Sequence, residues 1–268
     1  MPAAAPRALI TRPEPEASQW VQALAARGIA AAALPLMAIA PASDPQALAA
    51  VQRRLADYTA VMVVSGNAAR HFFESNQALA LMQKAQAAIK TRVWSPGPGT
   101  ASVLRALGVP AERIDQPAAG ARQFDSESLW ERVGPGVSAG DRVLVVRGSE
   151  PGANATGSGR DWLSAQIRAA GGEVDFVVAY TRAAPQFSHD QLALARSAAV
   201  TGGPLWVLSS AQALGHLCAA LPDQRWTGAR ALTTHPRIAE AARAAGFGAV
   251  FECRPALADV ATSIESHA

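Results

Sequence analysis

The chain has 268 residues, of which half are hydrophobic and 17% are charged, and its 24 Lys and Arg against 21 Asp and Glu give a formal charge of +3. This balance is typical of a globular protein with two modest domains, and it excludes a disordered chain. The chain has no basic run or group of aromatics typical of a nucleic-acid-binding surface, and its longest apolar run, residues 29–42, is too short to span a bilayer. Cys218 and Cys253 lie far apart, and no secretory signal opens the chain, so we expect a cytoplasmic protein with no nucleic-acid or membrane partner.

Short apolar runs alternate with alanine-rich amphipathic stretches along the chain. The predicted strands are residues 8–10, 29–39 (interrupted by Pro35), 60–64, 93–94, 142–146, 173–181, 205–208, 231–232 and 249–253. The predicted helices are residues 15–27, 45–57, a helix from 67, 100–107, 126–133, 160–170, 190–198, 211–221, 236–245 and a terminal helix. This alternation predicts an α/β fold with parallel sheets covered by helices on both faces.

Three strand–loop–helix units occur twice in the same order. Arg12 ends the first strand and Arg147 ends the corresponding later one. Ser65 and Ser209 follow equivalent strands at an offset of 209 − 65 = 144, and residues 100–109 match 238–247 at an offset of 238 − 100 = 138. The repetition indicates two related halves.

Four loops have the chemistry of an anion site, because each follows a strand and precedes a helix whose first N–H groups are unpaired. They are Ser65-Gly66-Asn67, Gly97-Pro98-Gly99-Thr100, Ser209-Ser210 and Thr234-His235-Pro236-Arg237. Plain helix N-capping is the alternative for each loop. Their recurrence in both halves favours a cleft that holds a multiply anionic ligand from two sides.

Arginines stand in or beside these loops at positions 12, 147, 160 and 237, and solvated surface arginine is the alternative for each. The five histidines have no metal-ligand spacing, and the glycine-rich stretch 148–159 is predicted to be a long loop rather than a dinucleotide fingerprint. The pattern therefore predicts neither a metal nor a cofactor.

The chain resembles the uroporphyrinogen-III synthase family along nearly its whole length. The segments that carry the resemblance are "LITRPEPEASQWVQALAARG" from Leu9, "VMVVSGNAARHFF" from Val61, "PGPGTASVLRALGV" from Pro96, "FDSESLW" from Phe124, "DRVLVVRG" from Asp141, "GRDWLSAQIRAAGGEVDFVVAYTR" from Gly159, "PLWVLSSAQALGHL" from Pro204 and "THPRIAEAARAAGF" from Thr234. Each is weak alone, but together they occur in the family's order.

The resemblance implies two α/β domains joined by a two-stranded hinge, with a discontinuous first domain of residues 1–39 plus 184–268 and a second of residues 43–179. It implies a lyase that converts hydroxymethylbilane to uroporphyrinogen III, with loss of water and inversion of the last pyrrole ring, in haem biosynthesis. Transient contact with the preceding deaminase and a monomeric state are further expectations.

The loops and the resemblance together define candidate site residues. The candidate substrate-binding residues are Arg12, Ser65, Gly66, Asn67, Gly99, Thr100, Ala101, Arg147, Arg160, Ser209, Ser210, Thr234, His235 and Arg237. Tyr180 in "VVAYTR" matches the family tyrosine proposed as general acid for loss of the hydroxyl group, and a structural tyrosine at the hinge is the alternative.

Two other classes of function stay open. A non-catalytic two-lobed α/β protein would bind an anionic ligand without turning it over. A glycosyltransferase-like enzyme would also pair two α/β domains and would bind a nucleotide sugar, although no acidic pair or base-stacking motif favours it.

Overall fold

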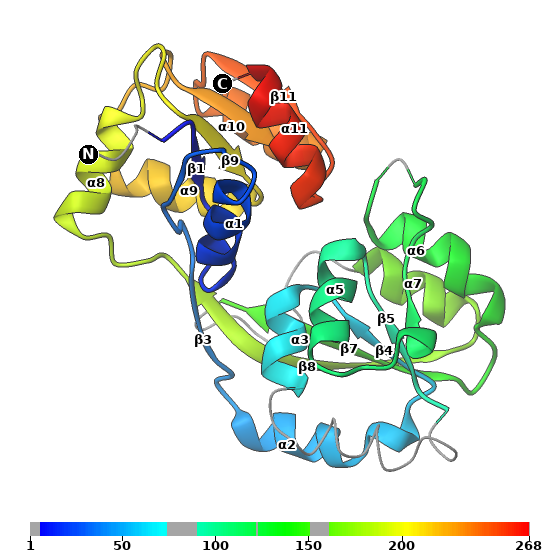
Figure 1. Cartoon of the computed structure of the whole chain (residues 1–268). Helices are drawn as coiled ribbons and strands as arrows, with labels where there is room; N and C mark the ends of the chain where they lie inside the picture. Colours follow the sequence, from blue (N-terminus) through cyan, green and yellow to red (C-terminus); the bar gives the residue numbers. More distant parts are fainter. Residues whose placement is uncertain (1–5, 74–89, 122, 151–160, 268) are drawn as a thin grey trace. The chain divides into compact units, whose positions relative to one another are not determined.

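The computed structural model describes residues 6–73, 90–121, 123–150 and 161–267, and it divides into two compact units (Figure 1). Unit 1 comprises Met1–Ile39 and Ala183–Ala268, and unit 2 comprises Ala40–Arg182. Unit 1 is therefore discontinuous, because its first strands and its last third come from opposite ends of the sequence.

Unit 1 is built on a five-stranded sheet of order β11-β10-β9-β1-β2 in which each paired strand is parallel to its neighbour. Its strands are β1 (Ala8–Ile10), β2 (Ala31–Ala33), β9 (Leu205–Leu208), β10 (Arg230–Thr233) and β11 (Ala249–Glu252). Its helices are α1 (Glu16–Ala25), α8 (His189–Ser197), α9 (Ala211–Ala220), α10 (Pro236–Ala244) and α11 (Leu257–His267).

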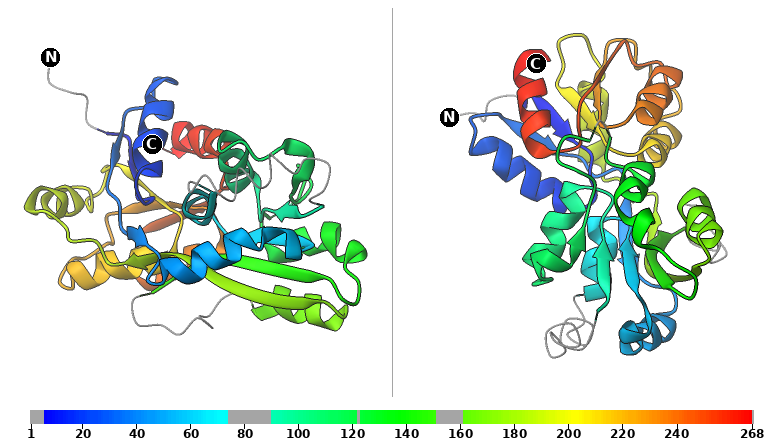
Figure 2. Two further views of the ribbon diagram at one scale, coloured as in Figure 1. Left: turned by 90° about the horizontal axis from the view of Figure 1, so that it is seen from below. Right: turned by 90° about the vertical axis from the view of Figure 1, so that its right-hand side faces the viewer.

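The pleat of this sheet divides its buried side chains between two cores. Leu9 and Trp206 pack in one hydrophobic cluster with residues of α8, α9 and α10. Their neighbours Ile10 and Val207 pack in the other with residues of α1 and α11, two helices that Figures 1 and 2 show over the sheet. Because successive side chains of a strand point to opposite faces, strands that are apolar throughout require helices on both. The predicted two-sided covering is confirmed for this sheet.

Unit 2 is built on a six-stranded sheet of order β3-β8-β7-β4-β5-β6. Its strands are β3 (Ala38–Pro41), β4 (Ala60–Val63), β5 (Arg92–Trp94), β6 (Ile114–Asp115), β7 (Arg142–Ser149) and β8 (Glu173–Ala183). Its described α-helices are α2 (Pro45–Arg53), α3 (Gly66–Phe73), α5 (Pro98–Ala106), α6 (Ser126–Val133) and α7 (Asp161–Ala169). Residues of α6 and α7 pack with Met62 and Val145 in one core, and α3 packs on β7 and α5.

The chain passes from unit 1 to unit 2 along β3 and returns along β8. These strands are neighbours in the sheet, and the Thr181 hydroxyl donates to the Pro41 carbonyl at 3.3 Å. Figure 2 shows the two long strands β7 and β8 side by side. The chain thus connects its two units only through β3 and β8 among the described strands, and these two strands form the two-stranded hinge expected from the family resemblance.

The two sheets share one strand order. β11-β10-β9-β1-β2 in unit 1 corresponds to β6-β5-β4-β7-β8 in unit 2, and β3 is an addition at the edge of the second sheet. The repeated segments of the sequence fall on equivalent elements: β1 and β7, β9 and β4, and helices α10 and α5. The shared order supports two related halves whose elements follow the chain in different orders.

Two strand predictions were wrong in detail. The predicted strand at residues 29–39 is divided between β2 in the first sheet and β3 in the second, because Pro35 lacks the N–H that continuous pairing requires. Arg147 does not end its strand, since β7 continues to Ser149 through a register shift opposite β8.

In the part of the chain that the structure describes, no helix is both long and apolar enough to cross a bilayer.

Candidate functional site

In unit 2, several candidate residues lie at one edge of the sheet. β4, β5, β7 and β8 are parallel, so their carboxyl ends meet at the same edge. Ser65 follows β4, Gly97 follows β5, and Tyr180 lies near the end of β8. This edge therefore combines a phenol, a serine hydroxyl and two helix N-termini.

Tyr180 is held on several sides. Its side chain is buried, with 5% exposure, and its hydroxyl lies 3.2 Å from Ser65 Oγ. The His71 ring stacks against it with centroids 5.8 Å apart and planes 19° apart. A Cβ on Gly148 would lie 2.4 Å from Tyr180 Cζ, so the ring occupies the space that only glycine leaves open. The phenol is fixed in position by its neighbours.

Ser65 caps helix α3. Its Oγ accepts a hydrogen bond from the Ala68 N–H at 3.1 Å, and its carbonyl accepts one from the Ala69 N–H at 3.0 Å. The capping alternative thus applies to Ser65, and the same oxygen also meets Tyr180. Gly66 and Asn67 form the first turn, with Gly66 against Val103 of α5.

The loop before α5 has a different construction. Gly97 is the N-cap residue and makes no side-chain cap, and Ser95 Oγ donates to the Gly97 carbonyl at 2.8 Å. Gly99 is exposed and Thr100 is half-buried, whereas Ala101 is buried with its N–H donated to the Gly97 carbonyl. In an α-helix the first backbone N–H groups have no partner within the helix, and the helix dipole favours an anion beside them. Gly99 and Thr100 therefore offer backbone donors, and Ala101 contributes packing.

In unit 1, the loops after β9 and β10 lie at the carboxyl edge of neighbouring parallel strands. Ser210 Oγ accepts from the Ala213 N–H at 3.2 Å and caps α9. His235 Nδ1 accepts from the Arg237 N–H at 3.1 Å and caps α10. Ser209, Thr234 and His235 are half-buried and Arg237 is exposed, so polar side chains remain at this edge beside the caps.

The candidate arginines differ in their surroundings. Arg12 Nη1 pairs with Glu16 at 2.9 Å, and its guanidinium lies 4.0 Å from the Trp20 ring centroid. Arg147 is buried, with 8% exposure, and lies 4.5 Å from the Phe176 ring centroid. These contacts hold both side chains within their own unit. Arg160 lies outside the described residues, as does the greater part of the predicted loop 148–159.

Thr11 is a strand-end residue that the sequence patterns did not indicate. Its buried hydroxyl donates to the Val207 carbonyl at 2.7 Å and ties the end of β1 to β9. A small polar residue directly after an apolar strand is the signal that could have identified it.

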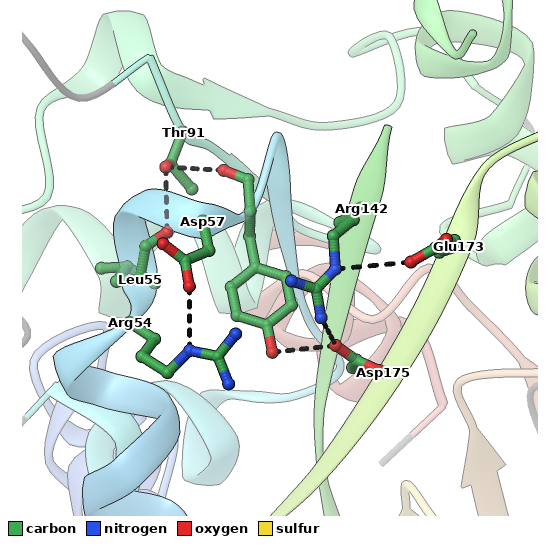
Figure 3. A network of polar contacts seen from close by, with 8 residues as sticks. Arg54, Leu55, Asp57, Thr91, Arg142, Glu173 and Asp175 are labelled. Atoms are coloured by element: carbon green, nitrogen blue, oxygen red, sulfur yellow. Dashed lines mark hydrogen bonds and ion pairs between the residues drawn. The ribbon is translucent and has the colours of Figure 1, made fainter. Parts of the chain in front are cut away.

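The opposite edge of the second sheet carries a separate polar network (Figure 3). The Tyr58 hydroxyl donates to Asp175 at 3.0 Å, and Arg142 donates to the same carboxylate at 2.7 Å and lies 3.5 Å from Glu173. Burial, followed by the hydrogen bond to Asp175, raises the pKa of Tyr58 to about 12. These residues lie at or just before the starts of β4, β7 and β8, and their hydrogen bonds and ion pairs join the three strands.

A cavity of about 230 Å³ also lies at the amino ends of the unit 2 strands. Its lining includes Ala60, Trp94 and Val143 beside the ion pair of Arg92 and Asp115. It is distinct from the loops at the carboxyl edge.

Burial makes both cysteine thiols poor nucleophiles. Burial raises the pKa of the Cys253 thiol to about 11 and also raises the pKa of Cys218, and both changes make a thiol a poorer nucleophile at neutral pH. Across the described residues, no three His, Cys, Asp or Glu side chains are grouped so that they could hold a metal ion.

The chain is similar to known proteins over almost its whole length. The family model "Uroporphyrinogen-III synthase HemD" matches residues 18–260. The chain is similar to a mutant uroporphyrinogen III synthase from the extremely thermophilic bacterium Thermus thermophilus, with 18% identity, a TM-score of 0.53, and coverage of 98% of this chain and 97% of that one. It is also similar to uroporphyrinogen-III synthetase from Helicobacter pylori, with 11% identity, a TM-score of 0.52 and 98% of both chains covered. At these identities the two structures show the fold, and they confirm the predicted fold class.

Proposed function

The chain belongs to the uroporphyrinogen-III synthase HemD family, and we propose that it is itself a uroporphyrinogen-III synthase, a lyase that closes hydroxymethylbilane to uroporphyrinogen III. The reaction loses water and inverts the last pyrrole ring, and in this proposal it requires neither metal nor cofactor. We place it in the cytoplasm, in haem biosynthesis, as a monomer that receives its substrate from the preceding deaminase.

The substrate carries acetate and propionate groups on each ring, so its binding site must supply many anion contacts. The helix N-termini after β4, β5, β9 and β10 offer backbone donors, and Thr100, Ser209, Ser210, Thr234 and His235 offer polar side chains beside them. Arg237 is exposed beside one of these loops and adds a cation. We propose these groups as the carboxylate contacts. Arg12, which pairs with Glu16, and the buried Arg147 are proposed as additional cations of this site.

One observation carries the catalytic part of the proposal. Tyr180, near the end of β8, has its hydroxyl 3.2 Å from Ser65 Oγ in a strand-end loop. Loss of the substrate hydroxyl as water needs a proton, and a positioned phenol can supply it. After that loss, closure of the ring is mainly an orientation problem, which many fixed contacts to a flexible polyanion solve.

The test is a coupled assay in which purified deaminase makes hydroxymethylbilane in place and the oxidised porphyrin isomers are separated. The free substrate closes without inversion to isomer I, so the protein should shift the product to isomer III. Tyr180→Phe should slow this reaction without abolishing it. Tyr58→Phe is the matched control, because the chain has two tyrosines and Tyr58 belongs to the network at the opposite edge. Unchanged isomer I with the wild-type protein would contradict the enzyme assignment and favour a non-catalytic two-lobed protein that binds an anionic ligand.

A further inference from the structure

Tyr180 and Ser65 differ in how far they can reach a substrate. The Tyr180 side chain is buried, and Gly148 and the stacked His71 ring enclose it. Ser65 is half-buried and stands in the loop between β4 and α3, beside the helix N-terminus proposed to contact substrate. A proton that leaves the phenol therefore meets Ser65 Oγ first.

We propose that Ser65 delivers the proton to the leaving hydroxyl and that Tyr180 replenishes it, so the two side chains act as a two-residue relay. This inference rests on the proposed function and deepens it, since it assigns the group that touches the reacting oxygen.

The hydrogen-bonding capacity of a hydroxyl supports this direction. A serine hydroxyl has one proton to donate and two lone pairs that accept. Ser65 Oγ already accepts the Ala68 N–H at 3.1 Å. If it also accepts the Tyr180 proton across 3.2 Å, both lone pairs are used and its own proton is left for a third partner. In that arrangement the cap and the phenol orient the serine proton away from both of them.

The backbone around Tyr180 is arranged to hold this pair. In the β7–β8 ladder, Arg147 pairs with Val178 but Gly148 pairs with Tyr180, so one residue of β8 is unpaired at this point. Such a bulge re-aims the side chains that follow it. Here the shift sets the Tyr180 ring over the Cβ position of Gly148 and its hydroxyl against Ser65.

The proton balance of the relay closes over the whole reaction. The C–O bond of the substrate hydroxymethyl group breaks as Ser65 gives its proton to the departing oxygen, which leaves as water. Ser65 takes the Tyr180 proton in turn and leaves a phenolate. Inversion of the last ring then forms a bond to its substituted α-carbon, breaks the bond from that carbon to the neighbouring methylene bridge, and joins that methylene carbon to the free α-carbon of the same ring. The free α-carbon loses its proton in this last step, and the proton returns to the phenolate through Ser65. The protein ends as it began, and no oxidant or reductant takes part.

The test compares Ser65→Ala, Tyr180→Phe and the double variant by kcat and KM in the coupled assay. A positioned general acid contributes on the order of 10² to 10⁴ in rate. We expect each single variant to lose about 100-fold in kcat with little change in KM, and the double variant to lose no more than either single one, because residues that act as a unit are not additive. Ser65→Thr, which keeps both the hydroxyl and the cap, should restore most of the activity.

Ser188→Ala is the matched control for loss of a helix cap. Ser188 caps α8 through the Gln191 N–H at 3.2 Å and is not one of the proposed site residues, so its loss should leave kcat unchanged. If Ser65→Ala behaves like Ser188→Ala while Tyr180→Phe is slow, Tyr180 acts directly and the relay is wrong. Losses that multiply in the double variant, or a rise in KM alone for Ser65→Ala, would also overturn it. A wild-type protein that makes no isomer III would instead defeat the proposed function, and with it the relay, before any variant is compared.

Discussion

Replacing Gly148 by alanine tests whether the Tyr180 ring is as closely fitted as the structure indicates. The added Cβ would lie 2.4 Å, 2.6 Å and 2.9 Å from Cζ, Cε2 and Cε1 of Tyr180. Carbon atoms in favourable contact are about 3.5–4.0 Å apart, so the ring would have to retreat by about 1 Å. From its present 3.2 Å, such a movement would break the contact between the phenol and Ser65 Oγ.

The cost of this change has two parts. Inserting a methyl group into a packed site costs about 1–3 kcal/mol, and a lost hydrogen bond costs about 1 kcal/mol more. We therefore expect Gly148→Ala to lower the free energy of unfolding by about 2–4 kcal/mol and to lower kcat in the porphyrin-isomer assay. Unfolding in urea, followed by circular dichroism, measures the first effect.

Two comparisons isolate the steric cause. Gly136→Ala in the same unit meets no atom within 4 Å of its new Cβ and should change neither property. In a Tyr180→Ala background the obstructing ring is absent, so Gly148→Ala should cost less than about 1 kcal/mol. Equal destabilisation by Gly148→Ala in both backgrounds would refute the close fit.

Three further predictions concern stability. The pKa of Tyr58 is raised to about 12 in the folded protein, so its contribution to the free energy of unfolding is full below about pH 10 and is lost between pH 10 and 12. In urea titrations at each pH, Tyr58→Phe should therefore reduce the loss of stability over this range by up to about 2 kcal/mol. An unchanged loss in the variant would contradict this role. Thr11→Val removes the buried donor to Val207 and should cost about 1–2 kcal/mol, whereas the exposed Thr262→Val should cost little; equal effects in urea unfolding would argue against the strand tie. Asp44→Ala removes the acceptor for the Ala47 N–H and should lower the free energy of unfolding by about 1 kcal/mol, whereas Asp44→Asn keeps a capping oxygen and should cost less. Equal melting temperatures for the two variants would exclude the cap.

The order of strands and helices could be predicted from the sequence because it depends on local patterns. Apolar runs such as residues 205–208 are buried on both faces, and glycines such as Gly28 and Gly171, each with a positive φ, follow the ends of α1 and α7. Pro35 marked an interruption, but no local signal shows that the strands on either side of it join different sheets. That division, like the discontinuous unit 1, depends on pairing between distant segments.

The loops of the candidate site could be predicted from the sequence, but the contacts between their side chains could not. Ser65 and Tyr180 are 115 residues apart, and their meeting depends on the bulge opposite Gly148, which no spacing in the sequence reveals. Arg12 pairs with Glu16 four residues along the chain, but Arg12 lies in the loop before α1, so helical spacing does not predict the pair. The burial of Arg147 against Phe176 could not be predicted either, because it depends on two neighbouring strands.

The measurement that tests the account most directly is a crystal structure of the protein with uroporphyrinogen III. We expect the product's acetate and propionate groups to contact the loops that follow β4, β5, β9 and β10, with Ser65 between Tyr180 and the macrocycle. A product bound instead in the cavity at the amino ends of β4, β5 and β7 would contradict it.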